Sequence, residues 1–132
     1  MNSKLTVVST QRPAQRRWQF DHHRLDAYHV ALQALVKGMA IINSLPRGYA
    51  KLKDQAARAL QGAFTQTTEA SARTGADRLA RYRSARAEAG EAAGLFEAFE
   101  HLRIADAADV DDVLELLWRL SAMLCRLAKL RR

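Results

Sequence analysis

Apolar residues recur three and four positions apart along four long segments of this chain. In the first segment they are Leu25, Tyr28, Leu32, Leu35, Met39 and Ile42. This spacing is the seam of a heptad repeat, and it is typical of helices that pack nearly parallel or antiparallel to one another. Four such helices joined by short turns predict an all-α fold, an antiparallel up-down-up-down four-helix bundle.

Turn and capping residues set the expected bounds of the helices. We expect helices over residues 21–44, 49–71, 75–102 and 107–130. Asp21 is a suitable N-cap for the first helix. Thr74 and Asp77 have the spacing of a capping box at the start of the third helix, and Asp106 or Asp109 can cap the fourth.

Small residues dominate the expected inner faces of the second and third helices. The inner face of the second helix is Leu52, Ala56, Ala59, Leu60, Ala63, Phe64 and Thr67. The inner face of the third is Leu79, Tyr82, Ala85, Ala89, Ala92 or Ala93, Phe96 and Phe99. Because alanine lets a neighbouring helix approach, these two helices are predicted to pack closest to each other.

The fourth helix carries more apolar residues than one core face needs. Its seam is Val110, Val113, Leu117, Leu120, Leu124 and Leu127, and a second stripe is Leu114, Leu116, Trp118 and Met123. The surplus indicates a subunit interface, with a thick monomer core as the alternative. Cys125, the single cysteine, falls among these residues, so we interpret it as a small core residue rather than a reactive thiol.

The chain of 132 residues is long enough for one domain with its own core. Residues 1–19 lack helical periodicity, and we expect them to form a flexible basic arm, with Trp18 a candidate for docking on the domain. Residues 20–132 form the bundle with a basic C-terminal tail. No apolar run approaches the roughly 20 residues of a membrane span, so no membrane partner is expected and a cytoplasmic location is the default.

The net charge of +7 is concentrated at the two ends of the chain. Lys4, Arg12, Arg16 and Arg17 lie in the first 20 residues, and this stretch has no acidic residue. In an up-down-up-down bundle, the start of the first helix, the turn between the second and third, and the end of the fourth meet at one pole. The expected pole is therefore basic, whereas the opposite pole carries a cluster of acidic residues: Glu97, Glu100, Asp106, Asp109, Asp111, Asp112 and Glu115.

A concentrated basic pole attracts polyanions, of which RNA and DNA are the usual ones. The candidate nucleic-acid-binding residues are Arg73, Arg78, Arg81, Arg83, Arg126, Lys129, Arg131 and Arg132. The alternative is that these arginines form an ordinary solvated helix face. Sequence-specific recognition is not indicated, because the chain has no helix-turn-helix, RNA-recognition or zinc-finger pattern.

Patterns typical of catalytic and metal sites are missing from the sequence. The four histidines are His22, His23, His29 and His101, and none belongs to a Glu-x-x-His pair of the kind that binds metal in bundles. Glu88 and Glu91 could share one helix face, where we expect ion pairs with nearby arginines. We therefore expect no catalytic residue, no metal and no cofactor, and the sequence argues against an enzyme.

One polar stripe follows the second helix. It consists of Gln55, Arg58, Gly62, Gln66, Glu69 and Arg73. Glu69 and Arg73 can pair at i,i+4, and Gln66 can hydrogen-bond a neighbouring helix. Buried polar groups of this kind often fix helix register or assembly state, so a structural role is the first interpretation.

At this stripe the chain resembles the four-helix-bundle family of 23S ribosomal RNA intervening-sequence proteins. The matching positions are Phe20, Leu25, Tyr28, Leu45-Pro46, Asp54-Gln55, Arg58-Ala59, Glu69, Ser71, Arg73, Tyr82, Ala85-Arg86 and Glu91. Gln66 stands where the family has Asn, and Ala70 and Ala72 replace its glycines. The resemblance implies that Gln55, Arg58, Gln66, Glu69, Arg86 and Glu91 are structural motif residues.

The resemblance also implies a homo-oligomer, since family members and the similar accessory proteins of diversity-generating retroelements form five-membered rings. It implies no catalytic activity, and for the retroelement relatives it implies binding to nucleic acid and to a reverse transcriptase. The leading hypothesis is a homopentameric nucleic-acid-binding accessory protein. The alternatives are a structural scaffold that binds another protein and, more weakly, an enzyme that uses Glu91, Glu69 and Arg58 in a cleft.

Overall fold

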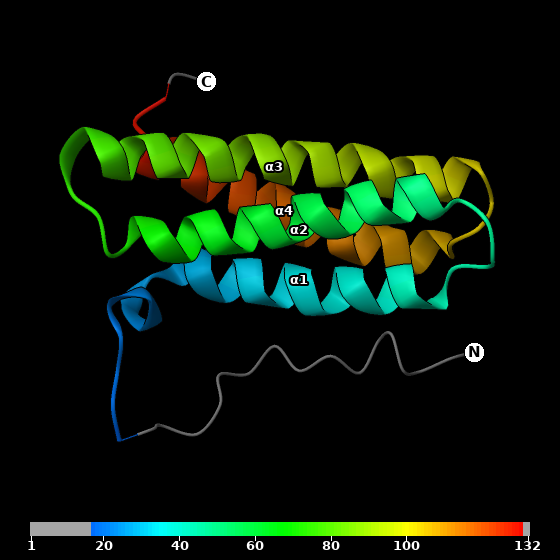
Figure 1. Ribbon diagram of the computed structural model, residues 1–132, viewed down its shortest axis with the longest axis horizontal. Coiled ribbons are helices and arrows are strands. Elements are labelled where there is room, and N and C mark those ends of the chain that lie inside the picture. The colour runs from blue at the N-terminus through cyan, green and yellow to red at the C-terminus, as the bar shows by residue number, and fades with distance from the viewer. Residues whose placement is uncertain (1–16, 131–132) are drawn as a thin grey trace.

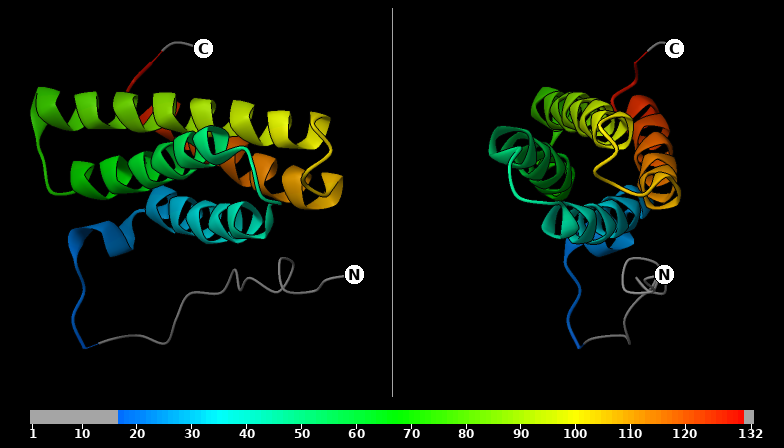
Figure 2. Two further views of the ribbon diagram at one scale, coloured as in Figure 1. Left: turned by 45° about the vertical axis from the view of Figure 1, so that its right-hand side comes forward. Right: turned by 90° about the vertical axis from the view of Figure 1, so that its right-hand side faces the viewer.

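The structure is a computed structural model, and it describes residues 17–130. Over this range the chain forms a short 3₁₀-helix, η1 (Asp21–Arg24), followed by four long helices: α1 (Asp26–Ser44), α2 (Ala50–Ala70), α3 (Gly75–His101) and α4 (Ala107–Leu127). Each helix runs opposite to the one before it (Figure 1). Each also packs against its two neighbours, and α4 returns to α1, so the four form a square seen end-on (Figure 2). The predicted four-helix bundle is confirmed.

The first long helix begins later than predicted. Asp21 opens η1 instead of α1, and Leu25, with φ −97° and ψ 115°, is extended and separates the two helices. The backbone N–H of Phe20 donates to Nδ1 of His23 at 3.0 Å, which closes the short turn. The prediction that Asp21 caps the first α-helix is therefore wrong, because this turn intervenes.

Capping by Asp106 is confirmed, whereas the predicted capping box at Thr74 is not formed. The Asp106 carboxylate accepts hydrogen bonds from the backbone N–H groups of Ala108 at 3.1 Å and Asp109 at 3.2 Å. Thr74 is the N-cap residue of α3, but its side chain makes no capping hydrogen bond. Asp77 forms ion pairs with arginines instead.

Helices α3 and α4 end in the same backbone motif. Arg103 (φ 61°) and Lys129 (φ 59°) occupy left-handed positions where glycine is usual. The N–H of Ile104 donates to the carbonyl of Phe99, and the N–H of Leu130 to that of Cys125, as in a Schellman motif. This motif ends α4 at Leu127, before the predicted end at residue 130. Both residues in the left-handed positions are cations, which suits the negative end of a helix dipole.

Helices α2 and α3 make the most extensive contact in the bundle, as predicted from their alanines. The buried residues of the two helices include five of the predicted alanines, and Ala92 rather than Ala93 faces the core: Ala56, Ala59, Ala63, Ala85, Ala89 and Ala92. Phe96 and Phe99 are also buried, with ring centroids 5.5 Å apart and perpendicular planes.

The inner face of α1 differs from the predicted seam. The buried residues there are Ala27, Val30, Ala31, Ala34, Lys37, Gly38, Ile41 and Ile42. The larger predicted residues Leu25, Leu35 and Met39 are only partly buried beside this face. A Cβ at Gly38 would lie 2.5 Å from Cδ1 of Leu60, so the backbone of α1 itself packs against α2. Small residues at the centre therefore bring α1 into the core.

The predicted core of α4 is confirmed in most positions, with Leu127 partly buried. Its second stripe is divided between core and surface. Leu114, Leu116 and Met123 pack partly buried against the core, whereas Trp118 is 72% exposed. Cys125 is buried, as predicted. No described helix has an apolar stretch long enough to cross a membrane.

Candidate nucleic-acid interface

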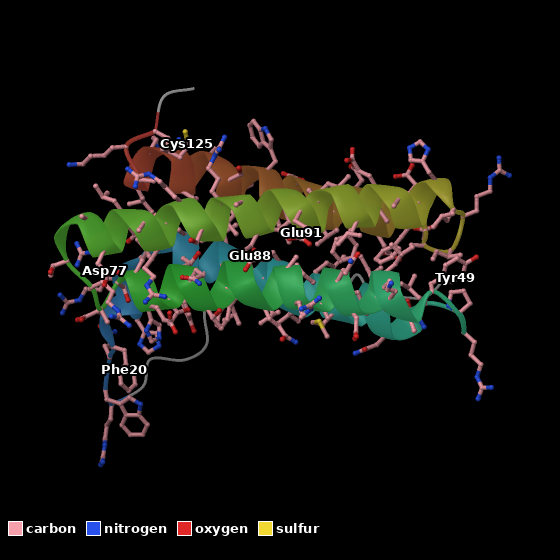
Figure 3. The ribbon with its side chains drawn as sticks, turned by 45° about the horizontal axis from the view of Figure 1, so that its top comes forward. Phe20, Tyr49, Asp77, Glu88, Glu91 and Cys125 are labelled. Atoms are coloured by element: carbon pink, nitrogen blue, oxygen red, sulfur yellow. The ribbon has the colours of Figure 1, made fainter. Side chains whose placement is uncertain are left out.

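One end of the bundle brings together η1, the α2–α3 turn and the end of α4 (Figure 1). We call this end the basic pole, and its described cations are Arg17, Arg24, Arg73, Arg78, Arg81, Arg83, Arg86, Arg126 and Lys129. The side-chain view places Phe20 and Asp77 at this end and Tyr49 at the other (Figure 3). The predicted residues Arg131 and Arg132, like residues 1–16 of the expected arm, lie outside the described residues.

Arg78 is engaged in holding the end of α2. Its Nε donates to the carbonyl oxygens of Arg73 at 2.7 Å and Ala70 at 3.2 Å. The carbonyl of Ala70, the last residue of α2, also accepts from the backbone N–H of Arg73 at 3.1 Å, so Arg78 adds a second partner there. Arg78 therefore reinforces the turn that follows α2, and its guanidinium is only partly available to a ligand.

Arg81 and Arg73 are paired with acidic residues of the same turn. Nη1 of Arg81 lies 3.1 Å from Oε1 of Glu69 and 3.3 Å from Oε1 of Gln66. Asp77 lies between the two arginines, with 3.7 Å to Nε of Arg81 and 3.4 Å to Nη1 of Arg73. The predicted hydrogen bond between Gln66 and a neighbouring helix is confirmed, with Arg81 of α3 as the donor. These pairs reduce the positive charge that the turn presents to a polyanion.

The predicted pairing of Glu69 with Arg73 is wrong. Helix α2 ends at Ala70, so Arg73 lies beyond the helix and does not follow Glu69 by one helical turn. The i,i+4 geometry needs both residues in one helix. Glu69 instead reaches across to α3 and binds Arg81.

Four cations of the basic pole that lie on α3 or at the end of α4 are exposed and lie outside these pairs. They are Arg83 and Arg86 on α3, Arg126 on α4 and Lys129 just after it. None of them takes part in the ion pairs between described residues. A solvated, unpaired cation can neutralise a phosphate without first losing another partner. These four residues are therefore suitable phosphate contacts.

The segment just before α1 adds residues that the predicted site did not include. Arg17 and Arg24 are exposed, and Trp18 and Phe20 are 56% and 59% exposed. The predicted docking of Trp18 on the domain is therefore wrong. The Cζ of Arg17 lies 6.0 Å from the centroid of the Trp18 ring. Two aromatic residues that closely follow Arg16 and Arg17 in the sequence are a signal that could have identified this segment.

Three histidines surround Tyr28 beside this segment. The ring centroid of His22 lies 4.5 Å from that of His23 and 4.4 Å from that of Tyr28. Nε2 of His29 lies 2.9 Å from the carbonyl oxygen of His23. Burial lowers the pKa of His22, and the neighbouring positive charges of His23 and His29 lower it further, against a weaker opposite effect of Asp21.

The residues of the weaker enzyme hypothesis are not linked to one another. Arg58, Glu69 and Glu91 are all exposed, and the side-chain hydrogen bonds between described residues join the Glu69 carboxylate only to Arg81. Gln55 is half-buried. Among the described residues, no three His, Cys, Asp or Glu side chains lie close enough together to hold a metal ion.

The ion pairs expected for Glu88 and Glu91 with arginines are not formed among the described residues. Instead the carboxylate of Glu88 lies against Gly62 of α2, where a Cβ would collide with it. The absence of a side chain at Gly62 therefore makes room for Glu88, and both acidic residues lie along α3 where it faces α2 (Figure 3).

Comparison with known proteins gives no match: no family model fits the chain, and no curated protein is similar to it. The resemblance to the intervening-sequence proteins stays a prediction that rests on the residues quoted for it.

Proposed function

We propose that this protein is a non-enzymatic accessory protein that binds nucleic acid through its basic pole and acts in the cytoplasm as a homopentamer. The observation that carries the proposal is a group of exposed cations that form no ion pair with another described residue: Arg83, Arg86, Arg126 and Lys129. They lie on the first half of α3 and at the end of α4, two segments that meet η1 at one end of the bundle (Figure 1). Such a group neutralises phosphates and releases counterions, which is the main source of affinity in non-specific binding.

The acidic residues at the other end of the bundle help to orient an approaching polyanion. Exposed acidic residues cluster there, namely Glu97, Asp106, Asp111, Asp112 and Glu115. The acidic residues here are partly offset by Arg47 and Lys51, so this end attracts a polyanion less than the basic pole does, and the protein's field orients the polyanion during encounter. Binding is therefore expected to weaken as salt screens both effects.

Fluorescence anisotropy with labelled RNA and DNA tests the proposal at low and rising salt. The variant Arg83→Gln/Arg126→Gln removes two exposed cations of the basic pole. The matched control Arg47→Gln/Lys51→Gln removes two exposed cations from the opposite end. We expect the first variant to bind more weakly and its salt slope to fall by about 0.7 to 0.9 for each phosphate that is no longer neutralised. Equal losses of affinity in both variants, or no binding by the wild type at low salt, would contradict the proposal.

Assembly into a ring is supported by apolar side chains left on the surface. Trp118 of α4 is 72% exposed and Val36 of α1 is 46% exposed. Sedimentation at micromolar protein concentration tests the assembly, and we expect a mass of five chains of 14.8 kDa. The mass of a single chain would exclude it.

A scaffold that binds another protein is the second candidate function, and the same exposed Trp118 favours it. An aromatic anchor is typical of protein interfaces, whose affinity depends less on salt than phosphate contacts do. Copurification from the native host at low and high salt separates the two functions. A protein partner retained at high salt and lost in Trp118→Ala would favour the scaffold, whereas nucleic acid released by salt favours the basic pole.

A further inference from the structure

We propose that the ligand of the basic pole is single-stranded nucleic acid, and that residues 17–24 form a platform on which its unpaired bases stack. This inference rests on the proposed function, since it names the kind of nucleic acid that the same pole takes. The platform consists of Trp18 and Phe20 with the neighbouring cations Arg17 and Arg24.

The two aromatic side chains of the platform are exposed, and cationic residues lie near them. Trp18 and Phe20 show more than half of their surface to solvent, although each is large and apolar. Arg17 lies over the Trp18 ring at 6.0 Å from its centroid. Aromatic rings interleaved with arginines are the arrangement by which proteins bind single strands, because a base stacks on the ring while a cation neutralises the adjacent phosphate.

Phe20 is held in position although it is exposed. Its ring is stacked on the imidazole of His22, with centroids 5.6 Å apart and planes inclined by 5°. Its backbone N–H is bound by Nδ1 of His23 at 3.0 Å. His22 in turn packs on Tyr28 of α1, with ring centroids 4.4 Å apart. This series of contacts supports the ring from the bundle, so less freedom is lost when a base stacks on it.

The position of the platform suits a strand that continues onto the basic pole. Phe20 lies at the same end of the molecule as Asp77 in the first turn of α3 (Figure 3). The exposed Arg24 follows Phe20 in η1, and Arg83 follows Asp77 on α3. Phosphates on either side of a stacked base can therefore meet cations from two parts of the chain.

A duplex cannot use this platform in the same way. Its bases are stacked on one another and present only their edges in the grooves, whereas a single strand can turn its bases outward. The sequence shows none of the patterns that enter a groove, such as a recognition helix. Exposed rings would add affinity for a single strand and little for a duplex of the same charge.

Anisotropy with two probes tests this inference: a fluorescein-labelled oligothymidine, and a blunt DNA hairpin with the same number of phosphates. The variant is Trp18→Ala/Phe20→Ala, and the matched control is Tyr49→Ala, which removes an exposed aromatic side chain from the opposite end of the bundle. We expect the platform variant to raise the Kd for oligothymidine roughly 5- to 100-fold and to leave the Kd for the hairpin almost unchanged. The control should change neither value.

The outcomes separate this inference from the proposed function. Unchanged oligothymidine binding by the platform variant, or an equal loss of affinity with both probes, overturns the platform, and the basic pole stands if Arg83→Gln/Arg126→Gln still weakens binding. A wild type that binds neither probe at low salt overturns both. Circular dichroism of the platform variant should match the wild type, because Trp18 and Phe20 lie outside the buried core.

Trp18 itself provides a second measurement. The chain has two tryptophans, so Trp118→Phe leaves Trp18 as the only indole. Stacking of a base on Trp18 should quench its fluorescence as oligothymidine is added, with the same Kd as in anisotropy, and the hairpin should quench it far less. The conservative variant Trp18→Phe should retain most of the affinity, since a phenyl ring also stacks. Fluorescence that stays constant at saturating oligothymidine would overturn the role of Trp18.

Discussion

The Nζ of Lys37 in α1 lies 3.6 Å from Oδ1 of Asp109 in the first turn of α4, and both side chains are almost fully buried, with 6% and 12% of their surface exposed. A second carboxylate, that of Asp112, lies 3.5 Å from the same Nζ and is 56% exposed. The cation thus joins α1 to α4 between residues of the core. Removing one partner of a buried ion pair leaves the other charge without compensation, which is costlier than losing the attraction itself.

Lys37→Met is therefore expected to destabilise the bundle by about 3 kcal/mol. Methionine has a volume similar to that of lysine, so the loss of unfolding free energy reflects the buried charge of Asp109. Urea unfolding at one fixed protein concentration measures the free energy of unfolding. Lys51→Met, at an exposed position of α2, is the matched control and should stay within about 0.5 kcal/mol of the wild type.

The double variant Lys37→Met/Asp109→Leu distinguishes a buried charge from poorer packing. With both charges removed, no ion remains buried, and we expect the unfolding free energy to recover part of the loss seen in Lys37→Met. If the loss of unfolding free energy in the double variant equals the sum of the losses in Lys37→Met and Asp109→Leu, the two residues are not a coupled ion pair.

The structure of α1 shows where sequence periodicity is sufficient and where it is not. The apolar spacing predicted four helices and most of the buried positions of α2, α3 and α4. In α1 the buried face is shifted from the predicted seam, of which only Ile42 is buried. This face combines small residues with larger apolar ones and Lys37, and it could not be identified before the partner Asp109 was known to lie opposite.

The candidate site at the basic pole could likewise be predicted only in part from the sequence. The predicted topology places the cations at one end of the bundle. The sequence does not show which of them are paired with other residues of the chain. Arg78 and Arg81 are engaged because α2 ends at Ala70 and turns back toward α3, a three-dimensional relationship. The contribution of Trp18 and Phe20 was missed because buried and exposed aromatic residues look alike in a sequence.

Gly38 and Gly90 are predicted to respond oppositely to the same substitution. Gly38→Ala would place a Cβ 2.5 Å from Cδ1 of Leu60 and 3.1 Å from Cζ of Phe96, so the core must shift, and we expect a loss of about 1–3 kcal/mol. A Cβ at Gly90 meets no atom within 4 Å, and Gly90→Ala should stabilise α3 by up to about 1 kcal/mol. Urea unfolding of both variants checks the signs, and stabilisation by Gly38→Ala would contradict the close packing of α1.

Asp106→Ala should destabilise the bundle by about 1 kcal/mol. The Asp106 carboxylate accepts from two backbone N–H groups at the start of α4, and alanine leaves both without that partner. Asp111→Ala removes an exposed acidic residue from the next turn of the same helix and is the matched control. Thermal unfolding should separate the two variants, and equal melting temperatures would contradict the cap.

The lowered pKa of His22 predicts that acid weakens the folded state. At a pH well above the ordinary histidine value of 6.5, the imidazole is neutral in both the folded and unfolded chain, so it contributes no pH dependence. As the pH falls below 6.5, the unfolded chain takes up the proton first, and the unfolding free energy decreases until the folded pKa is passed.

His22→Gln tests this linkage, because glutamine does not titrate. Urea unfolding between about pH 7.5 and pH 5.5 gives the pH dependence of the unfolding free energy. We expect the decrease toward acid to be smaller in His22→Gln than in the wild type. His101→Gln is the matched control, since it removes an exposed histidine that is the last residue of α3 and lies far from His22. A wild type and a His22→Gln variant with the same pH dependence would show that His22 does not couple protonation to folding.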